Sequence, residues 1–87
     1  RLPHMGWNSI KKRKENSLLN QLDDGSKFYF LHSYYFQCEN ECDILCETEY
    51  GITYSSAVNH GNIFGVQFHP EKSHYNGVQL LLNFSKL

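Results

Sequence analysis

Residues 65–73 of this 87-residue chain read Gly65-Val66-Gln67-Phe68-His69-Pro70-Glu71-Lys72-Ser73. The apolar first half of this stretch, bounded by glycine and proline, predicts a buried strand. Pro70 cannot donate a backbone hydrogen bond and favours an extended conformation at His69, so we expect the strand to end there. Because side chains two apart lie on one face of a strand, His69 and Glu71 are predicted to point the same way.

A histidine beside a carboxylate can supply the base and the orienting group of a nucleophilic triad. The carboxylate holds the imidazole in one tautomer and stabilises the imidazolium that forms during proton transfer. A His-x-Glu pair alone does not establish catalysis, because most such pairs are ordinary residues at the end of a strand. The catalytic interpretation of His69 and Glu71 therefore depends on the sequence around them.

Three motifs follow one another along the chain. They are Pro3-His4-Met5-Gly6-Trp7-Asn8, then Phe28-Tyr29-Phe30-Leu31-His32-Ser33-Tyr34, then Gln67-Phe68-His69-Pro70-Glu71-Lys72-Ser73 with Gly77 and an apolar helix after it. Together they resemble the class I (triad) glutamine amidotransferases and, within that class, the glutaminase subunits of imidazole glycerol phosphate synthase. The resemblance runs from Leu2 to about Phe84.

The resemblance implies an α/β fold, namely the C-terminal part of a three-layer α/β sandwich. Residues 1–87 would be the C-terminal portion of a single amidotransferase domain, with the N-terminal portion that carries the nucleophile elbow absent. This portion would contain mostly antiparallel strands, one parallel central strand ending at His69, and a C-terminal helix. Alone it would expose a sheet edge and an apolar face, so we expect it to be marginally stable or prone to aggregation.

The implied reaction is hydrolysis of the glutamine side-chain amide to glutamate and ammonia by a cysteine thiolate. The resemblance makes His69 the group that takes the thiol proton and gives it to the departing ammonia, and it makes Glu71 the group that orients His69. It places His32, Ser33 and Tyr34 along the glutamine pocket. It implies no cofactor.

The implied partner is a cyclase or synthase subunit, a (β/α)8 barrel that uses the ammonia in histidine biosynthesis. By resemblance, Trp7 and Lys72 face that subunit; rim packing for Trp7 and a solvated side chain for Lys72 are the simpler alternatives. A net charge of −1 and a pI near 6.6 give no case for nucleic acid as a partner. No apolar run approaches the ~20 residues that span a bilayer, and no targeting segment is recognisable, so we expect no membrane contact and a cytoplasmic location.

The three cysteines are odd in number and predict no disulfide framework. Cys38, Cys42 and Cys46 lack the paired C-x2-C spacing of zinc sites, so we expect no metal site. Acidic residues flank each of them, which disfavours a reactive thiolate. None lies in the Gly-x-Cys-x-Gly elbow of the family. We therefore expect that these 87 residues alone do not hydrolyse glutamine.

Three other functions remain open from the sequence. A paralogous amidotransferase could feed ammonia to another synthase, such as one that aminates sugars for surface polysaccharide. A non-catalytic interaction module could retain the motif without a nucleophile. A metal-binding protein using cysteine and histidine is the third alternative. The basic cluster Lys11–Lys14 is compatible with either amidotransferase, and we interpret it as a solvated loop.

Local patterns predict the remaining elements. Met5–Asn8 is expected to form a turn, and Asn16–Leu22 a short helix with leucines on one side. The predicted strands are Lys27–Phe36, Ile44–Glu49, Thr53–Val58 and Ile63–Phe68. A final helix, capped by Ser73 or Asn76, is expected to bury one apolar face. The residues of that face are Val78, Leu80, Leu81, Leu82 and Phe84.

Overall fold

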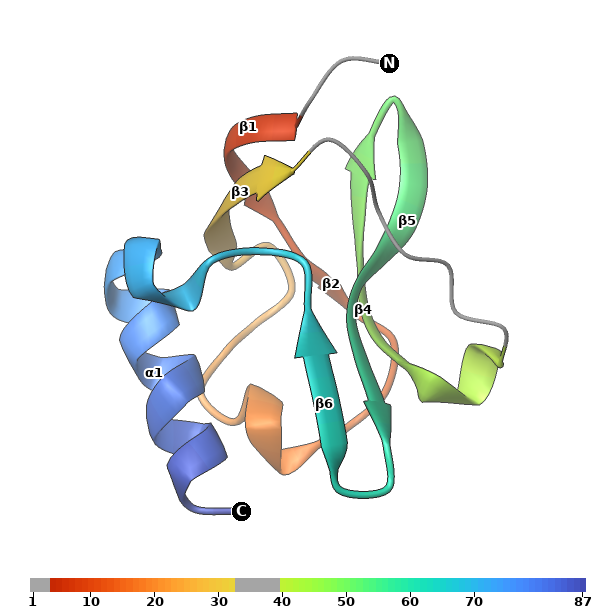
Figure 1. Cartoon of the computed structure of the whole chain (residues 1–87), viewed down its shortest axis with the longest axis vertical. Coiled ribbons are helices and arrows are strands. Elements are labelled where there is room, and N and C mark those ends of the chain that lie inside the picture. The colour runs from red at the N-terminus through yellow and green to blue at the C-terminus, as the bar shows by residue number, and fades with distance from the viewer. Residues whose placement is uncertain (1–3, 33–39) are drawn as a thin grey trace.

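The computed structural model describes residues 4–32 and 40–87, and Figure 1 shows their arrangement. The strands are β1 (His4–Ser9), β2 (Lys11–Lys12), β3 (Lys27–His32), β4 (Ile44–Tyr50), β5 (Ile52–His60) and β6 (Ile63–Val66). The helical elements are three 3-10 helices, η1 (Ser17–Leu19), η2 (Glu41–Asp43) and η3 (Pro70–Lys72), and the α-helix α1 (His74–Ser85).

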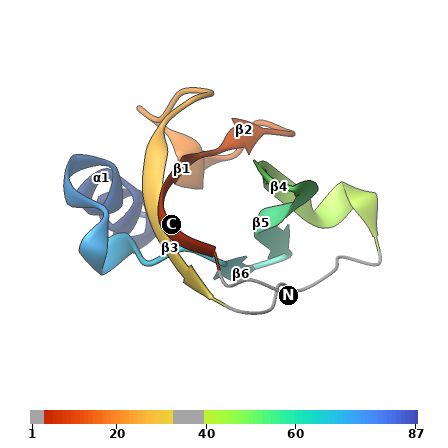
Figure 2. The same cartoon turned by 90° about the horizontal axis from the view of Figure 1, so that it is seen from above.

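The strands form two antiparallel sheets that are joined into a ring. One sheet pairs β1 with β3, and the other has the order β2-β4-β5-β6. Only Ile10 separates β1 from β2, so one stretch of chain contributes to both sheets. On the other side, Phe68 bridges to Phe30 of β3 just after β6. Figure 2 shows the strands around this ring, with α1 outside it next to β3.

The predicted strand end at His69 is wrong. β6 ends at Val66 and pairs with β5 in the antiparallel direction. The next residues leave β5 and cross to β3. The Gln67 N–H still donates to the Ser56 carbonyl of β5 at 2.9 Å, but the His69 N–H donates to the Tyr29 carbonyl of β3 at 2.9 Å. His69 is thereby attached to β3 of the other sheet.

Aromatic rings and aliphatic side chains fill the core. Phe68 stacks on Phe28 with ring centroids 4.1 Å apart and meets Phe30 edge-on at 5.6 Å. Such contacts add to the ~25 cal/mol per Å² that burial of apolar surface contributes. Other buried core residues are Ile10, Leu18, Leu19, Leu22, Leu45, Cys46, Tyr54, Ala57 and Leu80.

Two predictions about the N-terminal half need correction. Residues 5–8 belong to strand β1 rather than to a turn, and Gly6 accommodates a φ of +120° within that strand. Only Ser17–Leu19 is helical in the segment predicted as a helix, because Gln21 takes a φ of +66° and turns the chain away. The side chain of Asn16 caps this 3-10 turn by accepting from the Leu18 N–H.

The later strands agree with their predictions within a few residues. β4 contains the predicted strand Ile44–Glu49 and continues one residue further, and β5 contains the predicted strand Thr53–Val58. β3 covers Lys27–His32 of the predicted Lys27–Phe36 strand, and residues 33–36 lie outside the described residues.

Helix α1 packs inward through a different face from the predicted one. Gly77, Leu80 and Asn83 are buried, and the Asn83 amide donates to the carbonyls of Leu18 and Asn20. Of the five residues predicted to be buried, Leu80 alone is; Val78, Leu81, Leu82 and Phe84 are 46–67 % exposed. Ser73 stands at the N-cap position but makes no capping bond with its side chain.

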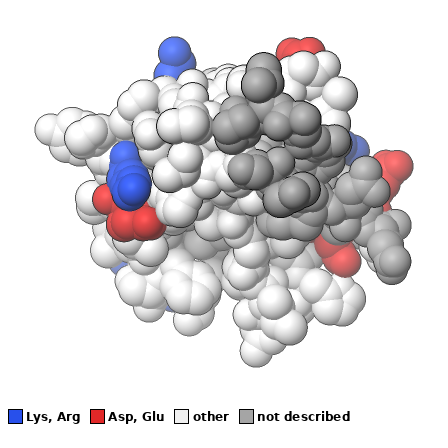
Figure 3. Space-filling view, turned by 45° about the horizontal axis from the view of Figure 1, so that its top comes forward, with Lys and Arg blue, Asp and Glu red and all other residues white. Residues whose placement is uncertain are grey.

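The face of the molecule in Figure 3 has no single dominant charge among the described residues. On the face in Figure 3, basic and acidic side chains are scattered and occur next to one another. Among the residues that the structure describes, no helix is long and apolar enough to cross a membrane.

Candidate active site

His69 and Glu71 meet in the turn after β6. The His69 Nδ1 lies 3.1 Å from the Glu71 Oε2, so the two side chains point the same way as expected. The cause differs from the expected strand alternation, because Glu71 belongs to the 3-10 helix η3, which begins at Pro70. The other ring nitrogen, Nε2, lies 3.3 Å from the carbonyl oxygen of Leu31 at the end of β3.

Glu71 is prepared to act as a hydrogen-bond acceptor. A hydrogen bond from its own backbone N–H, and after it the bond from His69, hold the pKa of the Glu71 carboxyl below its usual value. An ionised carboxylate accepts from Nδ1–H, which in a neutral ring leaves Nε2 without a proton. The Leu31 carbonyl beside Nε2 can only accept, so Nε2 must turn from it to take a proton from a reacting partner. The side chains of His69 and Glu71 are 36 % and 63 % exposed, so the pair is open to solvent and to any group that approaches it.

Ser73 ties this turn to β3. The buried Ser73 hydroxyl donates to the His69 carbonyl at 2.6 Å and accepts from the Tyr29 N–H at 2.9 Å. The sequence suggested Ser73 only as a helix cap. The missed signal is a small polar residue directly after a turn that starts with proline, where a hydroxyl can satisfy backbone groups on both sides.

Gly77 allows α1 to lie against the same turn. A Cβ atom at Gly77 would be 1.8 Å from the Pro70 carbonyl oxygen, far inside any real contact. A glycine inside an apolar helical pattern indicates such close packing. The position of His69, Pro70 and Glu71 therefore depends on having glycine, which lacks a side chain, at position 77 of α1.

Of the three expected pocket residues, the structure describes His32 alone. His32 ends β3, directly after the Leu31 whose carbonyl contacts His69. The His32 Nε2 is 3.1 Å from the hydroxyl of Tyr54 on β5. Ser33 and Tyr34 lie outside the described residues.

The Tyr54 contact belongs to a buried cluster that the sequence did not reveal. The Tyr54 hydroxyl also lies 2.9 Å from the His4 Nδ1, and His4 stacks between the rings of Phe30 and Tyr50 at 4.6 and 4.0 Å. Burial and the neighbouring His32 lower the pKa of His4. Residues of four strands thus surround His4.

The two expected partner-facing residues lie on neighbouring surface segments. Trp7 is 47 % exposed on β1, and its ring stacks on His74 with centroids 5.3 Å apart. Lys72 is exposed on η3, two residues before His74. Trp7 therefore reaches the segment that carries Lys72.

Of the described cysteines, the buried Cys46 is not an activated thiol. Burial, and after it the charge of Asp24, raise the pKa of Cys46 to about 12. Cys42 is exposed at η2, and Cys38 lies outside the described residues. No group of three or more His, Cys, Asp or Glu side chains among the described residues is placed to hold a metal ion.

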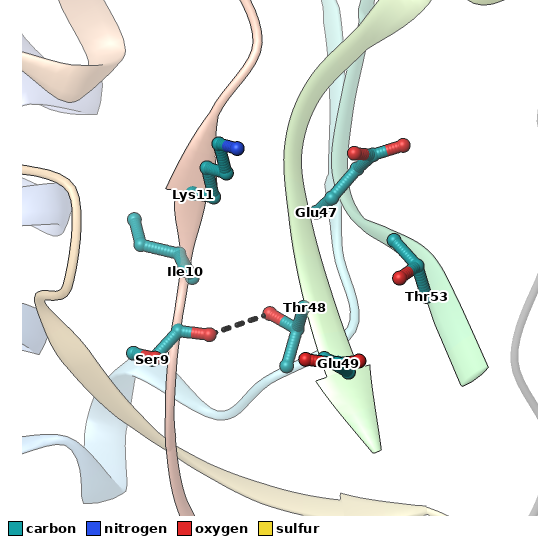
Figure 4. Close-up of a pocket in the computed structure, with 7 residues that line it drawn as sticks. All are labelled: Ser9, Ile10, Lys11, Glu47, Thr48, Glu49 and Thr53. Atoms are coloured by element: carbon teal, nitrogen blue, oxygen red, sulfur yellow. Dashed lines mark hydrogen bonds between the residues drawn. The ribbon is translucent and has the colours of Figure 1, made fainter. Parts of the chain in front are cut away.

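A separate hollow of about 330 Å³ lies between β2 and β4, and Figure 4 shows its lining. Within it, the Thr48 hydroxyl donates to the Ser9 carbonyl at 3.0 Å. The Glu47 carboxylate of its lining pairs at 2.6 Å with Arg13, which is not a lining residue. Its lining residues are Ser9, Ile10, Lys11, Glu47, Thr48, Glu49 and Thr53. It contains neither His69 nor Glu71, so it is not part of the candidate active site.

Comparison with known families gives this geometry a context. The model of the class-I glutamine amidotransferase family matches residues 1–86, nearly the whole chain. The chain therefore belongs to the class I glutamine amidotransferases.

Within this family, the chain is similar to proteins named imidazole glycerol phosphate synthase subunit HisH. It is 51 % identical over 86 residues to the one from Leptospira borgpetersenii, with 99 % of this chain and 42 % of that protein covered. It is 52 % identical to HisH 2 of Methanococcus maripaludis, covering 99 % and 43 %. For the Bacillus cytotoxicus subunit the identity is 53 %, covering 97 % and 40 %. The chain thus spans about two fifths of the length of these relatives.

Proposed function

We propose that this chain supplies the histidine and the glutamate of a glutaminase that hydrolyses glutamine to glutamate and ammonia. One observation carries the proposal: the contact between His69 and Glu71 at 3.1 Å, in a chain that matches the amidotransferase family from end to end. An imidazole with a carboxylate on Nδ1 can exchange a proton with a nucleophile through Nε2, which for His69 requires Nε2 to leave the Leu31 carbonyl.

In the proposed reaction, His69 takes the proton of a cysteine thiol, and the thiolate attacks the carboxamide carbon of glutamine. The imidazolium, stabilised by Glu71, then gives the proton to the departing ammonia, and water releases glutamate from the thioester. The thiol would come from a Gly-x-Cys-x-Gly segment, which is not among these 87 residues. His32, Ser33 and Tyr34 would line the pocket for the amino-acid end of glutamine.

We further propose that the ammonia passes to a cyclase subunit with a (β/α)8 barrel, in a cytoplasmic heterodimer of histidine biosynthesis. The names of the relatives support this partner, since they are subunits of imidazole glycerol phosphate synthase. Trp7 and Lys72 would contact the barrel, because they are exposed on neighbouring segments beside the His69–Glu71 turn.

The test is glutamate release by the natural full-length protein, with and without its barrel partner. Glutamine should be hydrolysed, and asparagine, which is one methylene shorter, should not. The 87 residues alone should be inactive, because no cysteine among them has the elbow sequence. Absence of glutamate release by the full-length protein with its partner bound would refute the proposed function.

A further inference from the structure

An apolar groove of about 150 Å³ lies between helix α1 and strand β6. Apolar side chains form its two walls, namely Phe64 and Val66 on β6 and Leu80, Leu81 and Phe84 on α1. Leu18 and Pro70 complete the lining, so no charged side chain takes part in it. In Figure 1, β6 is the strand of its sheet nearest to α1. We call this surface the α1–β6 groove.

The described residues fill only the bottom of this groove. Leu18 and Leu80 are buried in the core, but Leu81 and Phe84 remain about half exposed at the rim. Across the groove, Phe64 meets Phe84 edge-on with ring centroids 6.1 Å apart. A rim of half-exposed leucine and phenylalanine side chains above a buried floor is typical of a surface on which another element docks.

The adjacent edge of the sheet is open as well. Among the residues that the structure describes, β6 is the last strand of the order β2-β4-β5-β6, and β5 is its only strand partner. An unpaired strand edge beside an apolar face is a template for further packing or pairing, which folded proteins normally cover. The groove and this edge therefore form one continuous uncovered surface.

The length of the relatives indicates what covers this surface. The chain spans about two fifths of the HisH proteins that it matches, so more than half of each relative lies outside the match. Layers of one domain pack against each other through wholly apolar faces, whereas the interface with a separate subunit has a polar rim. The uncharged lining of the α1–β6 groove corresponds to the first case.

The groove also adjoins the candidate active site. Pro70, which lines it, lies between His69 and Glu71, so an element seated in the groove contacts the turn that carries both. The two residues that we propose to face the barrel, Trp7 and Lys72, do not line the groove. The surface beside Pro70 is thus separate from the proposed barrel contact.

We propose that the N-terminal portion of the same polypeptide, which carries the Gly-x-Cys-x-Gly segment, covers the α1–β6 groove and is thereby held against the His69 turn. Neither the barrel subunit nor a second copy of the chain occupies the groove. The inference rests on the proposed function for one point, the thiol in the covering portion. The covering itself does not depend on the reaction.

The experiment compares Leu81→Cys with Leu82→Cys in the natural full-length protein without its barrel partner. These adjacent leucines of α1 are 49 % and 46 % exposed in this chain, but only Leu81 lines the groove. Each variant is treated with a maleimide, and peptide masses identify the labelled cysteine. Leu81→Cys should react at least ~10-fold more slowly than Leu82→Cys, because a covered thiol reacts only after local opening. Dilution or addition of the barrel should change neither rate.

Three results would overturn the inference. Equal rates for the two variants would show that the groove is open in the full-length protein. Slow labelling of Leu81→Cys only after the barrel is added would make the barrel the occupant. Slow labelling that is lost on dilution would make a second copy the occupant.

Hydroxyl-radical footprinting of the unsubstituted full-length protein gives a second measurement that needs no variant. Phe84 and Tyr75 are both aromatic residues of α1, 53 % and 90 % exposed in this chain. If the groove is covered, Phe84 should be oxidised ~10-fold less than Tyr75, well beyond this difference in exposure. Similar oxidation of the two would also overturn the inference. Neither measurement uses glutamine, so both remain decisive if no glutamate is released, a result that would instead refute the proposed function.

Discussion

Two histidines of this chain are held in opposite ways. His69 lies in a partly exposed turn against the carboxylate of Glu71, whereas His4 is buried against neutral partners and two aromatic rings. A carboxylate stabilises the protonated ring, and burial among neutral groups opposes it. The comparison shows that partner and burial, rather than the imidazole itself, separate a histidine suited to proton transfer from one suited to structure.

The largest effect is expected from removing the exposed member of this comparison. His69→Ala should lower kcat for glutamine hydrolysis by the full-length protein ~10²–10⁴-fold, because general acid–base catalysis contributes about that much. His60→Ala is the matched control, since the His60 side chain is 79 % exposed and contacts Asp43 instead. Glutamate release measures both. If His69→Ala retained activity within tenfold of the wild type, the assigned role of His69 would be wrong.

The packing that supports the exposed pair can be broken at Gly77. In Gly77→Ala the new Cβ would meet the backbone of Pro70 at 1.8 Å, which a side-chain rotation cannot relieve. We expect a loss of about 3 kcal/mol in the free energy of unfolding, at the upper end of the usual cost of overpacking, together with reduced activity.

Gly65→Ala is the control for Gly77→Ala, because a Cβ at Gly65 would meet a Val58 methyl at 3.4 Å. Denaturant unfolding measures both variants. Equal stability of Gly77→Ala and the wild type would contradict the close approach of α1 to the His69 turn.

A smaller effect is expected at the hydroxyl that joins this turn to β3. Ser73→Ala removes the acceptor of the Tyr29 N–H and the donor to the His69 carbonyl. Leaving buried groups unsatisfied costs ~1–3 kcal/mol, so the unfolding midpoint should fall accordingly. Ser85→Ala, at an exposed hydroxyl of α1, should cost less than about 0.5 kcal/mol. A similar loss for the two variants would show that Ser73 has no special role.

The smallest effect is expected on the pH dependence of the free energy of unfolding, to which the buried His4 contributes. The lowered pKa of His4 means that the unfolded chain binds more protons there than the folded chain at pH values near and below the ordinary value of 6.5. Stability is therefore lost as the pH falls below about 6.5. Within residues 4–32 and 40–87, the titratable groups that face His4 are His32, Tyr50 and Tyr54.

His4→Phe tests this contribution, because it keeps a ring between Phe30 and Tyr50 but removes the titration. The free energy of unfolding of this variant should fall less steeply between pH 7 and pH 5 than that of the wild type. An unchanged slope in His4→Phe would show that His4 does not titrate with a lowered pKa.

Short-range patterns in the sequence predicted more than long-range ones. The strands of residues 44–60 follow from β-forming residues on either side of Tyr50-Gly51, because a hairpin is a local structure. The adjacency of His69 and Glu71 was predicted from strand alternation, but in the structure a 3-10 turn brings the two side chains together. The catalytic roles assigned to these two residues stay predictions.

The face of α1 that packs inward was not predictable in the same way. Most apolar side chains of α1 are exposed in the described structure. Hydrophobicity alone therefore predicted burial of Val78 and Phe84, whereas Gly77 and Asn83 are the buried residues. Gly77 is buried because the Pro70 carbonyl comes so close, and Asn83 because two carbonyls of the η1 region accept its amide protons.

The sequence by itself determined the family, the neighbouring histidine and glutamate, and most of the strands, because motifs and alternation are local properties. The tertiary structure decided the partners of each histidine. Tyr54 meets His4 and His32 across 50 and 22 positions of sequence, and Ser73 meets Tyr29 across 44. Such pairs carry no local signal, since they exist only after the strands have closed into a ring and brought their polar side chains together.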